Sequence, residues 1–180
     1  MKRALLVIDY TVDFVAPDGK LTCGEPGQAL EGKIVSIIEE FIASGDLVVF
    51  ANDVHYEGDT LHPETKLFPP HNLYRTAGRD LYGKVKTAYE KNKDVCIFLD
   101  KTRYSAFAGT KLGILLAERR IMDVHLVGVC TDICVLHTAV DAYNSGYSIT
   151  VHADAVASFN AQGHDWALGH FKGSLGANVI

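Results

Sequence analysis

The chain has 180 residues, with 17 basic and 22 acidic side chains and a formal net charge of −5. This length fits one domain of ordinary size, and the mild acidic balance argues against a nucleic-acid-binding protein, which needs a basic surface. Its apolar runs are far shorter than the roughly 20 residues of a bilayer-spanning helix. We therefore expect a single domain over residues 1–180 that binds neither nucleic acid nor membrane.

Short apolar runs alternate along the chain with stretches of helical periodicity. Strands are predicted at residues 5–8, 47–51, 95–99, 124–129 and 147–151, with a short last strand at 177–180. Apolar residues at helical spacing predict helices over residues 30–42, 110–120, 133–143 and 161–172. Apolar strands separated by helices indicate a parallel sheet covered on both faces. The predicted fold is a three-layer α/β/α domain with a doubly wound, mostly parallel, six-stranded sheet.

The cysteines and the N-terminus favour a cytoplasmic protein with free thiols. The apolar stretch that opens the chain ends at Asp9, which makes it too short for the apolar core of a signal peptide. The chain has four cysteines: Cys23, Cys96, Cys130 and Cys134. We expect free thiols rather than disulfides in a cytoplasmic chain with its own core. No paired C-x-x-C motifs are present, so a structural zinc knuckle is not expected.

Polar and nucleophilic side chains follow four of the predicted strands. Asp9 follows the first strand, residues 53–55 the second, residues 100–101 the third and residues 130–134 the fourth. In open parallel sheets, ligands bind at the carboxyl ends of the strands, which share one edge. These residues, although scattered in sequence, are therefore predicted to converge there.

Cys134 is the candidate nucleophile. It lies in the predicted first turn of a helix that Thr131 or Asp132 can cap, where the helix dipole favours a thiolate and free backbone N–H groups can bind an oxyanion. Its position is off the apolar stripe of that helix, which argues against a core role. Cys130 lies closer to the strand and is interpreted as a packing residue whose main chain contributes to the site.

The segment 53–80 departs from the alternation of strands and helices and carries candidate metal ligands. Asp53 and His55 project from the same side of an extended segment, and His62, Glu64 and His71 follow within the same loop. Mixed carboxylate and imidazole ligands suit Zn²⁺, Fe²⁺ or Mn²⁺ better than Ca²⁺. A long irregular loop in a compact domain is usually functional, so a metal site is predicted here.

Three aromatic residues are candidates for stacking on a flat substrate: Phe14, Phe68 and Tyr104. Core packing is an equally good explanation for them. No glycine-rich phosphate-binding fingerprint is present, so no nucleotide cofactor is expected. The remaining histidines are interpreted as surface or core residues: His125, His137, His152, His164 and His170.

Three segments together resemble the signatures of the isochorismatase-like cysteine hydrolases. They are residues 4–14 (ALLVIDYTVDF), 100–107 (DKTRYSAF) and 128–135 (GVCTDICV), in the family's order and across essentially the whole chain. Within that family, residues 53–55 and 61–71 look like the metal loop of the nicotinamidases, and the closest similarity is to the compact bacterial type.

The resemblance implies a catalytic triad of Asp9, Lys101 and Cys134. It also implies a cis peptide bond between Val129 and Cys130, and an oxyanion hole formed by the backbone amides of Cys130 and Cys134. The family often has a small residue at position 130, so Cys130 departs mildly from the pattern.

The metal ligands that the resemblance implies are Asp53, His55 and His71. The fourth ligand varies between family members, so Glu64 and His62 both remain candidates, with Glu64 favoured by similarity to the compact type. One divalent ion is expected, and Zn²⁺ is preferred over Fe²⁺ and Mn²⁺ as its identity.

The activity that the resemblance implies is hydrolysis of nicotinamide to nicotinate and ammonia. Asp9 would take the Cys134 proton, Lys101 would orient Asp9, and the thiolate would form a thioester. The metal would hold the pyridine nitrogen, and Phe14, Phe68 and Tyr104 would pack on the ring. Relatives commonly associate, so a homo-oligomer is expected.

Two other functions stay open at this point. One is hydrolysis of another small substrate on the same scaffold, such as isochorismate, a different amide or a ureide; the metal loop argues for the amidase. The other is a catalytically silent binding protein that keeps the fold, although all three triad residues are present.

Overall fold

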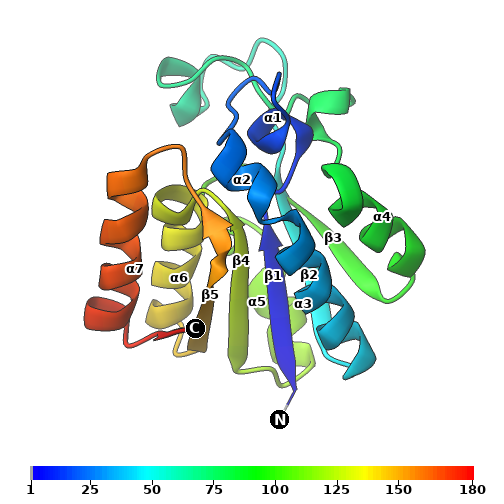
Figure 1. Cartoon of the computed structure of the whole chain (residues 1–180), viewed down its shortest axis with the longest axis vertical. Coiled ribbons are helices and arrows are strands. Elements are labelled where there is room, and N and C mark those ends of the chain that lie inside the picture. The colour runs from blue at the N-terminus through cyan, green and yellow to red at the C-terminus, as the bar shows by residue number, and fades with distance from the viewer. Residues whose placement is uncertain (1) are drawn as a thin grey trace.

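The computed structural model describes residues 2–180 and has one parallel sheet between two helical layers (Figure 1). The six strands are β1 (Arg3–Ile8), β2 (Leu47–Asp53), β3 (Cys96–Lys101), β4 (Asp123–Val129), β5 (Ser148–Ala157) and β6 (Asn178–Val179). Their order is β3-β2-β1-β4-β5-β6, and every neighbouring pair is parallel. The predicted three-layer fold with a doubly wound six-stranded sheet is confirmed.

Two hydrophobic clusters fill the space between the sheet and the helices. On one face, apolar residues of β1, β2 and β4 pack with α5 (Leu112–Glu118), α6 (Leu136–Asn144) and α7 (Ala161–Leu175). On the other face they pack with α1 (Val12–Val15), α3 (Glu31–Ala43) and α4 (Gly83–Asn92), beside α2 (Glu25–Ala29). Strand β1 is buried by both clusters because its side chains alternate between the two faces.

Several predicted boundaries differ from the structure. The fifth strand continues to Ala157 beyond a register shift opposite Leu126 and Gly128, and the polar residues His152 and Asp154 interrupt the apolar run that predicted the strand. Helix α4 was not predicted, because only Val85 and Ala88 of its residues are buried and the rest of the helix is polar. The helices α1 and α2, which are short, were also missed.

The long segment after β2 covers the carboxyl edge of the sheet and contains two 3₁₀ helices, Pro63–Lys66 and Ala77–Arg79. In Figure 1 it lies at the top of the molecule, beyond the strand ends. Within residues 2–180, no helix is both long and apolar enough to cross a membrane.

Candidate active site and metal cluster

Four candidate side chains meet at the carboxyl edge of the sheet, as the strand order predicts. Asp9 directly follows β1, Asp53 ends β2, Lys101 ends β3, and Cys134 lies in the turn after β4. Asp53 and Lys101 are register partners on the adjacent strands β2 and β3, so the strand pairing itself places the two residues next to each other. Convergence of residues far apart in sequence follows from the parallel topology.

The Lys101 ammonium group is at the centre of this arrangement, and its side chain is fully buried. Its Nζ lies 2.7 Å from Oδ2 of Asp9 and 2.5 Å from Oδ1 of Asp53. It also donates to the Arg103 carbonyl at 3.2 Å and lies 3.6 Å from Sγ of Cys134. We call Asp9, Lys101 and Cys134 the Lys101 centre.

Asp9 is held by the backbone around it. The residue adopts a left-handed conformation with φ of 54°, which Asp tolerates better than most residues. Its amide donates to the Ala51 carbonyl at 3.1 Å, and its Oδ1 accepts the Asp53 amide at 2.8 Å. Burial, together with the charge of Asp53, raises the pKa of Asp9 to about 6 even though Lys101 opposes the shift.

The other charges of the site follow from burial and mutual attraction. Burial alone would lower the pKa of Lys101, but the charges of Asp53 and Asp9 raise it well above its ordinary value. Burial alone would raise the pKa of Asp53, but Lys101 and His55 hold it below its usual range. Lys101 is therefore an ammonium group between two carboxyl groups.

The Cys134 thiol differs from the expectation of a thiolate favoured by a helix dipole. Burial raises the pKa of Cys134 well above its ordinary value, although the nearby Lys101 charge opposes this. The resting sulfur is therefore a protonated thiol, and a base must remove its proton before attack. The Asp9 carboxylate is within 4.8 Å of the sulfur.

The turn that carries Cys134 is a single π-helical turn, Thr131–Val135, that leads into α6. The expected cap from Thr131 or Asp132 is wrong, because neither side chain caps the turn. The Thr131 hydroxyl lies 2.8 Å from Nδ1 of His164, and Asp132 accepts from Ser158 at 2.6 Å. Both side chains thus anchor the turn to the β5–α7 region.

The expected cis peptide bond between Val129 and Cys130 is confirmed. Just before it, Gly128 has φ of 114°, and a Cβ placed there would lie 2.0 Å from the Ile8 carbonyl oxygen. Only glycine therefore allows β4 to approach β1 this closely next to Asp9.

A second group of side chains lies beside the Lys101 centre. One ligand atom each from Asp53, His55, Glu64 and His71 falls within 4.8 Å of the others. Oδ2 of Asp53, Nε2 of His55, Oε1 of Glu64 and Nε2 of His71 are buried and find no hydrogen-bond partner among residues 2–180. Such unpartnered buried atoms are costly unless a cation binds them. We call these four residues the carboxylate–histidine cluster, and its donor set fits a divalent metal.

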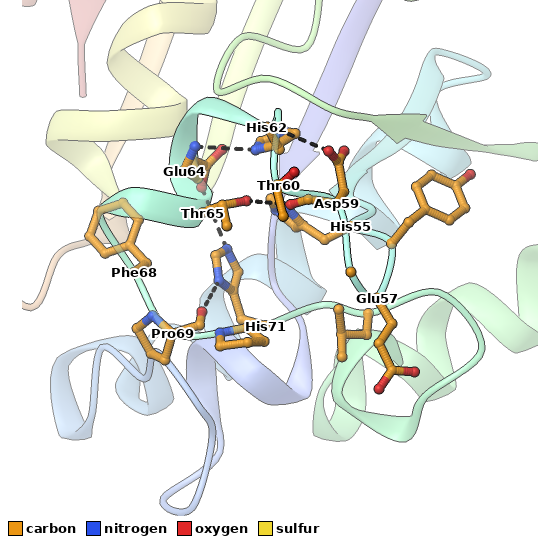
Figure 2. Close-up of a pocket in the computed structure, with 14 residues that line it drawn as sticks. His55, Glu57, Asp59, Thr60, His62, Glu64, Thr65, Phe68, Pro69 and His71 are labelled. Carbon is orange, nitrogen blue, oxygen red and sulfur yellow. Dashed lines mark hydrogen bonds and ion pairs between the residues drawn. The ribbon is translucent and has the colours of Figure 1, made fainter.

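His62 lies next to this cluster but has both ring nitrogens engaged. Its Nε2 lies 2.7 Å from the Thr102 carbonyl, and its Nδ1 accepts the Glu64 amide at 3.2 Å. Figure 2 shows Glu64 and His71 turned toward each other, with His62 beside Glu64. His71 is oriented by its Nδ1, 2.8 Å from the Pro69 carbonyl, which leaves Nε2 facing the cluster.

Phe14, Phe68 and Tyr104 line one small pocket together with Asp53, Glu64 and Cys134. The pocket therefore touches both the Lys101 centre and the carboxylate–histidine cluster. Its remaining walls are Cys130, which was expected at the site through its main chain, and three residues that the sequence did not indicate: Leu21, Ile133 and Phe159. Leu21 and Phe159 belong to no recognisable motif, and their place in the pocket depends on the three-dimensional path of the chain.

A polar network that was also missed holds the loop beside the cluster. The Asn72 amide donates to Oδ2 of Asp13 at 2.7 Å, and the Thr11 hydroxyl donates to the Asn72 side-chain oxygen at 2.9 Å. These contacts fix the chain directly after His71 against α1. Asp13 lies within the first signature segment, residues 4–14, and this position was the only indication in the sequence that it has a role near the site.

Comparison with known proteins identifies the family. The model of the isochorismatase domain matches residues 3–180. A Bacillus subtilis protein described as an uncharacterized isochorismatase family protein PncA is 62% identical over 181 residues, covering 99% of each chain. The crystal structure of nicotinamidase/pyrazinamidase PncA from Bacillus subtilis has a TM-score of 0.98 and 58% identity, and covers 100% of both chains.

A more distant structure bears on the carboxylate–histidine cluster. Pyrazinamidase of Pyrococcus horikoshii in complex with zinc has a TM-score of 0.84 and 26% identity, covering 100% of this chain and 99% of that one. The match of the domain model over almost the whole length, supported by the close relative, is sufficient for assignment. The chain belongs to the isochorismatase family.

Proposed function

We propose that this protein is a nicotinamidase that hydrolyses nicotinamide to nicotinate and ammonia through a thioester on Cys134. The observation that carries the proposal is the small pocket that touches Cys134, Asp53 and Glu64 together and has aromatic walls. A flat ring that carries a carboxamide matches this combination of a thiol, a metal-binding cluster and aromatic surfaces. The names of the Bacillus subtilis structure and of the zinc complex agree with amide hydrolysis.

In the first half of the proposed reaction, Asp9 accepts the proton of the Cys134 thiol. The sulfur then attacks the carboxamide carbon, and the backbone amides of Cys130 and Cys134 donate to the resulting oxyanion. Asp9 returns the proton to the nitrogen, the carbon–nitrogen bond breaks, and ammonia leaves a thioester behind. The Lys101 ammonium, 2.7 Å from Asp9, keeps that carboxylate oriented throughout.

In the second half, Asp9 takes a proton from a water molecule that attacks the thioester carbon. The carbon–sulfur bond breaks, the Cys134 sulfur regains its proton from Asp9, and nicotinate leaves. The same carboxylate therefore serves as base and acid in both halves. This double role requires that the Asp9 carboxylate stay close to the Cys134 sulfur. The hydrogen bonds of Asp9 with Ala51 and Asp53 hold it in place.

We assign a divalent metal to Asp53, His55, Glu64 and His71, and we choose Glu64 over His62 as the fourth ligand. The reason is that Oε1 of Glu64 is buried without a partner among residues 2–180, whereas both nitrogens of His62 have partners. When bound, the metal supplies a Lewis acid for the pyridine nitrogen. Phe14, Phe68 and Tyr104 pack against the ring and limit its orientation.

Ammonia release from nicotinamide by the purified protein tests this proposal. We expect release that is lost after chelator treatment and recovered on addition of Zn²⁺, Fe²⁺ or Mn²⁺. Release that continues in protein shown to be metal-free would contradict the role of the cluster. No release by metal-loaded protein would contradict the substrate, and other small amides on the same triad would then be screened.

A further inference from the structure

Two cysteines outside the Lys101 centre lie in direct contact. Sγ of Cys23 is 3.1 Å from Sγ of Cys130, although the residues are 107 positions apart in sequence. Both are buried, with 4% and 6% of their surface exposed. Both thiols are free, so the contact is between two reduced sulfurs.

The two cysteines belong to two chain segments that both line the small pocket. Cys23 lies in the segment between α1 and α2, its amide donates to the Phe14 carbonyl at 2.8 Å, and Leu21 belongs to the same segment. Phe14 and Leu21 line the pocket on that side, and Cys130 lines it beside Cys134. A bond between the sulfurs would tie these two segments together.

We propose that Cys23 and Cys130 form a reversible disulfide, a modification site next to the nucleophile. A bonded pair has its sulfurs about 2.05 Å apart, so closure needs a displacement of only about 1 Å. The co-reactant is an electrophilic two-electron oxidant such as a hydroperoxide. The Cys130 sulfur attacks one peroxide oxygen, the oxygen–oxygen bond breaks, and the Cys130 proton leaves with the released alcohol or water, so that Cys130 becomes a sulfenic acid. The Cys23 sulfur then attacks the Cys130 sulfur, the sulfur–oxygen bond breaks, and the hydroxyl group leaves as water with the Cys23 proton.

The bond would act on the turn that carries the nucleophile. The Cys130 carbonyl accepts the amides of Ile133 and Val135, each at 3.1 Å, so a shift of Cys130 moves the start of this turn. On the proposed function, the Cys130 amide also belongs to the oxyanion hole. The oxidised protein should therefore hydrolyse nicotinamide at least about tenfold more slowly than the reduced one, because oxyanion donors are sensitive to small displacements.

Diamide is the probe for the test, because it takes two electrons and two protons from neighbouring thiols without forming higher sulfur acids. The wild type, Cys23→Ala and the matched control Cys96→Ala are each treated and mapped by mass spectrometry without reduction. We expect a Cys23–Cys130 cross-link in the wild type and in Cys96→Ala. A link between Cys130 and Cys134, or no intramolecular link, would overturn the proposal.

Ammonia release before and after dithiothreitol tests the effect on turnover. We expect a reversible loss in the wild type and in Cys96→Ala, whereas Cys23→Ala should have normal basal activity and keep it in diamide. A cross-linked protein with unchanged turnover would overturn the effect on the turn. Cross-linking in a protein that never releases ammonia would contradict the nicotinamidase assignment while leaving the modification site intact.

Discussion

The Lys101 centre and the carboxylate–histidine cluster lie side by side, but they compensate their buried charges in different ways. In the first, the chain supplies its own cation, since the Lys101 ammonium lies within 2.7 Å of Asp9 and of Asp53. In the second, one buried atom from each of four residues has no hydrogen-bond partner among residues 2–180, and the charged groups face one another at 3.5 Å (His71 and Glu64) and 3.9 Å (His55 and Asp53). Unpaired buried polar atoms are expensive, so the chain itself supplies the counter-charge of the first site, whereas the donor set of the second fits a cation from solution.

Asp53, a member of the carboxylate–histidine cluster, also contacts the Lys101 centre. Its Oδ1 contacts Lys101, while its Oδ2 faces the cluster without a partner among the described residues. The backbone carbonyl of the same residue accepts from Arg79 at 2.9 Å, which fixes the end of β2. A substitution of Asp53 is therefore expected to alter both sites. Variants at other positions are needed to measure the contribution of each site alone.

The largest effect is expected from Cys134→Ala in the Lys101 centre. Turnover should fall roughly 10⁴-fold or more, because the covalent route disappears. Metal content and thermal stability should change little, since the cluster is untouched. Ammonia release, metal analysis and thermal melting measure the three quantities, and measurable turnover above one hundredth of the wild-type rate would remove the thioester mechanism.

Asp9→Asn should reduce turnover by about 10²–10⁴-fold, because it removes the group that moves every proton in the proposed reaction. The amide side chain keeps the shape of the carboxylate, so nicotinate should still bind. Steady-state kinetics with a nicotinate-binding measurement separates the two effects. A loss smaller than tenfold would show that another base serves Cys134.

The cluster is tested by a matched pair of neighbouring residues, Glu64 and His62. Glu64→Gln should weaken metal binding more than about 100-fold, since it removes a charged ligand, whereas His62→Gln should weaken it by about tenfold because His62 only supports Glu64. Metal titration of the apoprotein gives both numbers. Equal losses, or a larger loss for His62→Gln, would make His62 the ligand.

The strand ends of the site could be predicted from the sequence, and the pocket walls could not. Asp9, Asp53 and Lys101 follow apolar strands, so their convergence is a consequence of parallel topology alone. Leu21 and Phe159 reach the pocket only through the path of the chain outside the sheet. Apolar residues in such segments have no periodicity that distinguishes a pocket wall from ordinary packing.

The residue pattern alone did not distinguish Glu64 from His62 as the fourth ligand, and only the resemblance to the compact type favoured Glu64. The residues are two positions apart in one loop, and both are ligand types. The difference depends on the Thr102 carbonyl, 40 positions away in the chain, which occupies Nε2 of His62. The raised pKa of the Cys134 thiol is a similar case, since it depends on burial and on carboxylates that the fold brings beside the turn.

The smallest expected effect concerns histidines that, unlike those of the cluster, have partners within the protein. Nδ1 of His125 lies 3.0 Å from Nε2 of His152, and both residues are buried beneath Phe41, remote from the strand ends that form the site. Burial, reinforced by the His125 charge, lowers the pKa of His152 to about 4. Asp123, 3.7 Å from Nε2 of His125, only partly opposes the lowering of the His125 pKa.

Because the unfolded state binds the proton near pH 6.5 and the folded state only near pH 4, this pair must lose stability as the pH falls. Between pH 7 and pH 5, the free energy of unfolding should drop by about 2 kcal/mol through His152, with His125 adding in the same direction. His152→Asn removes one titrating group and should flatten this part of the curve relative to the wild type. Urea unfolding of both proteins at several pH values measures the difference; parallel curves would mean that His152 has the same pKa in the folded and unfolded states, which would contradict the lowering of its pKa by burial.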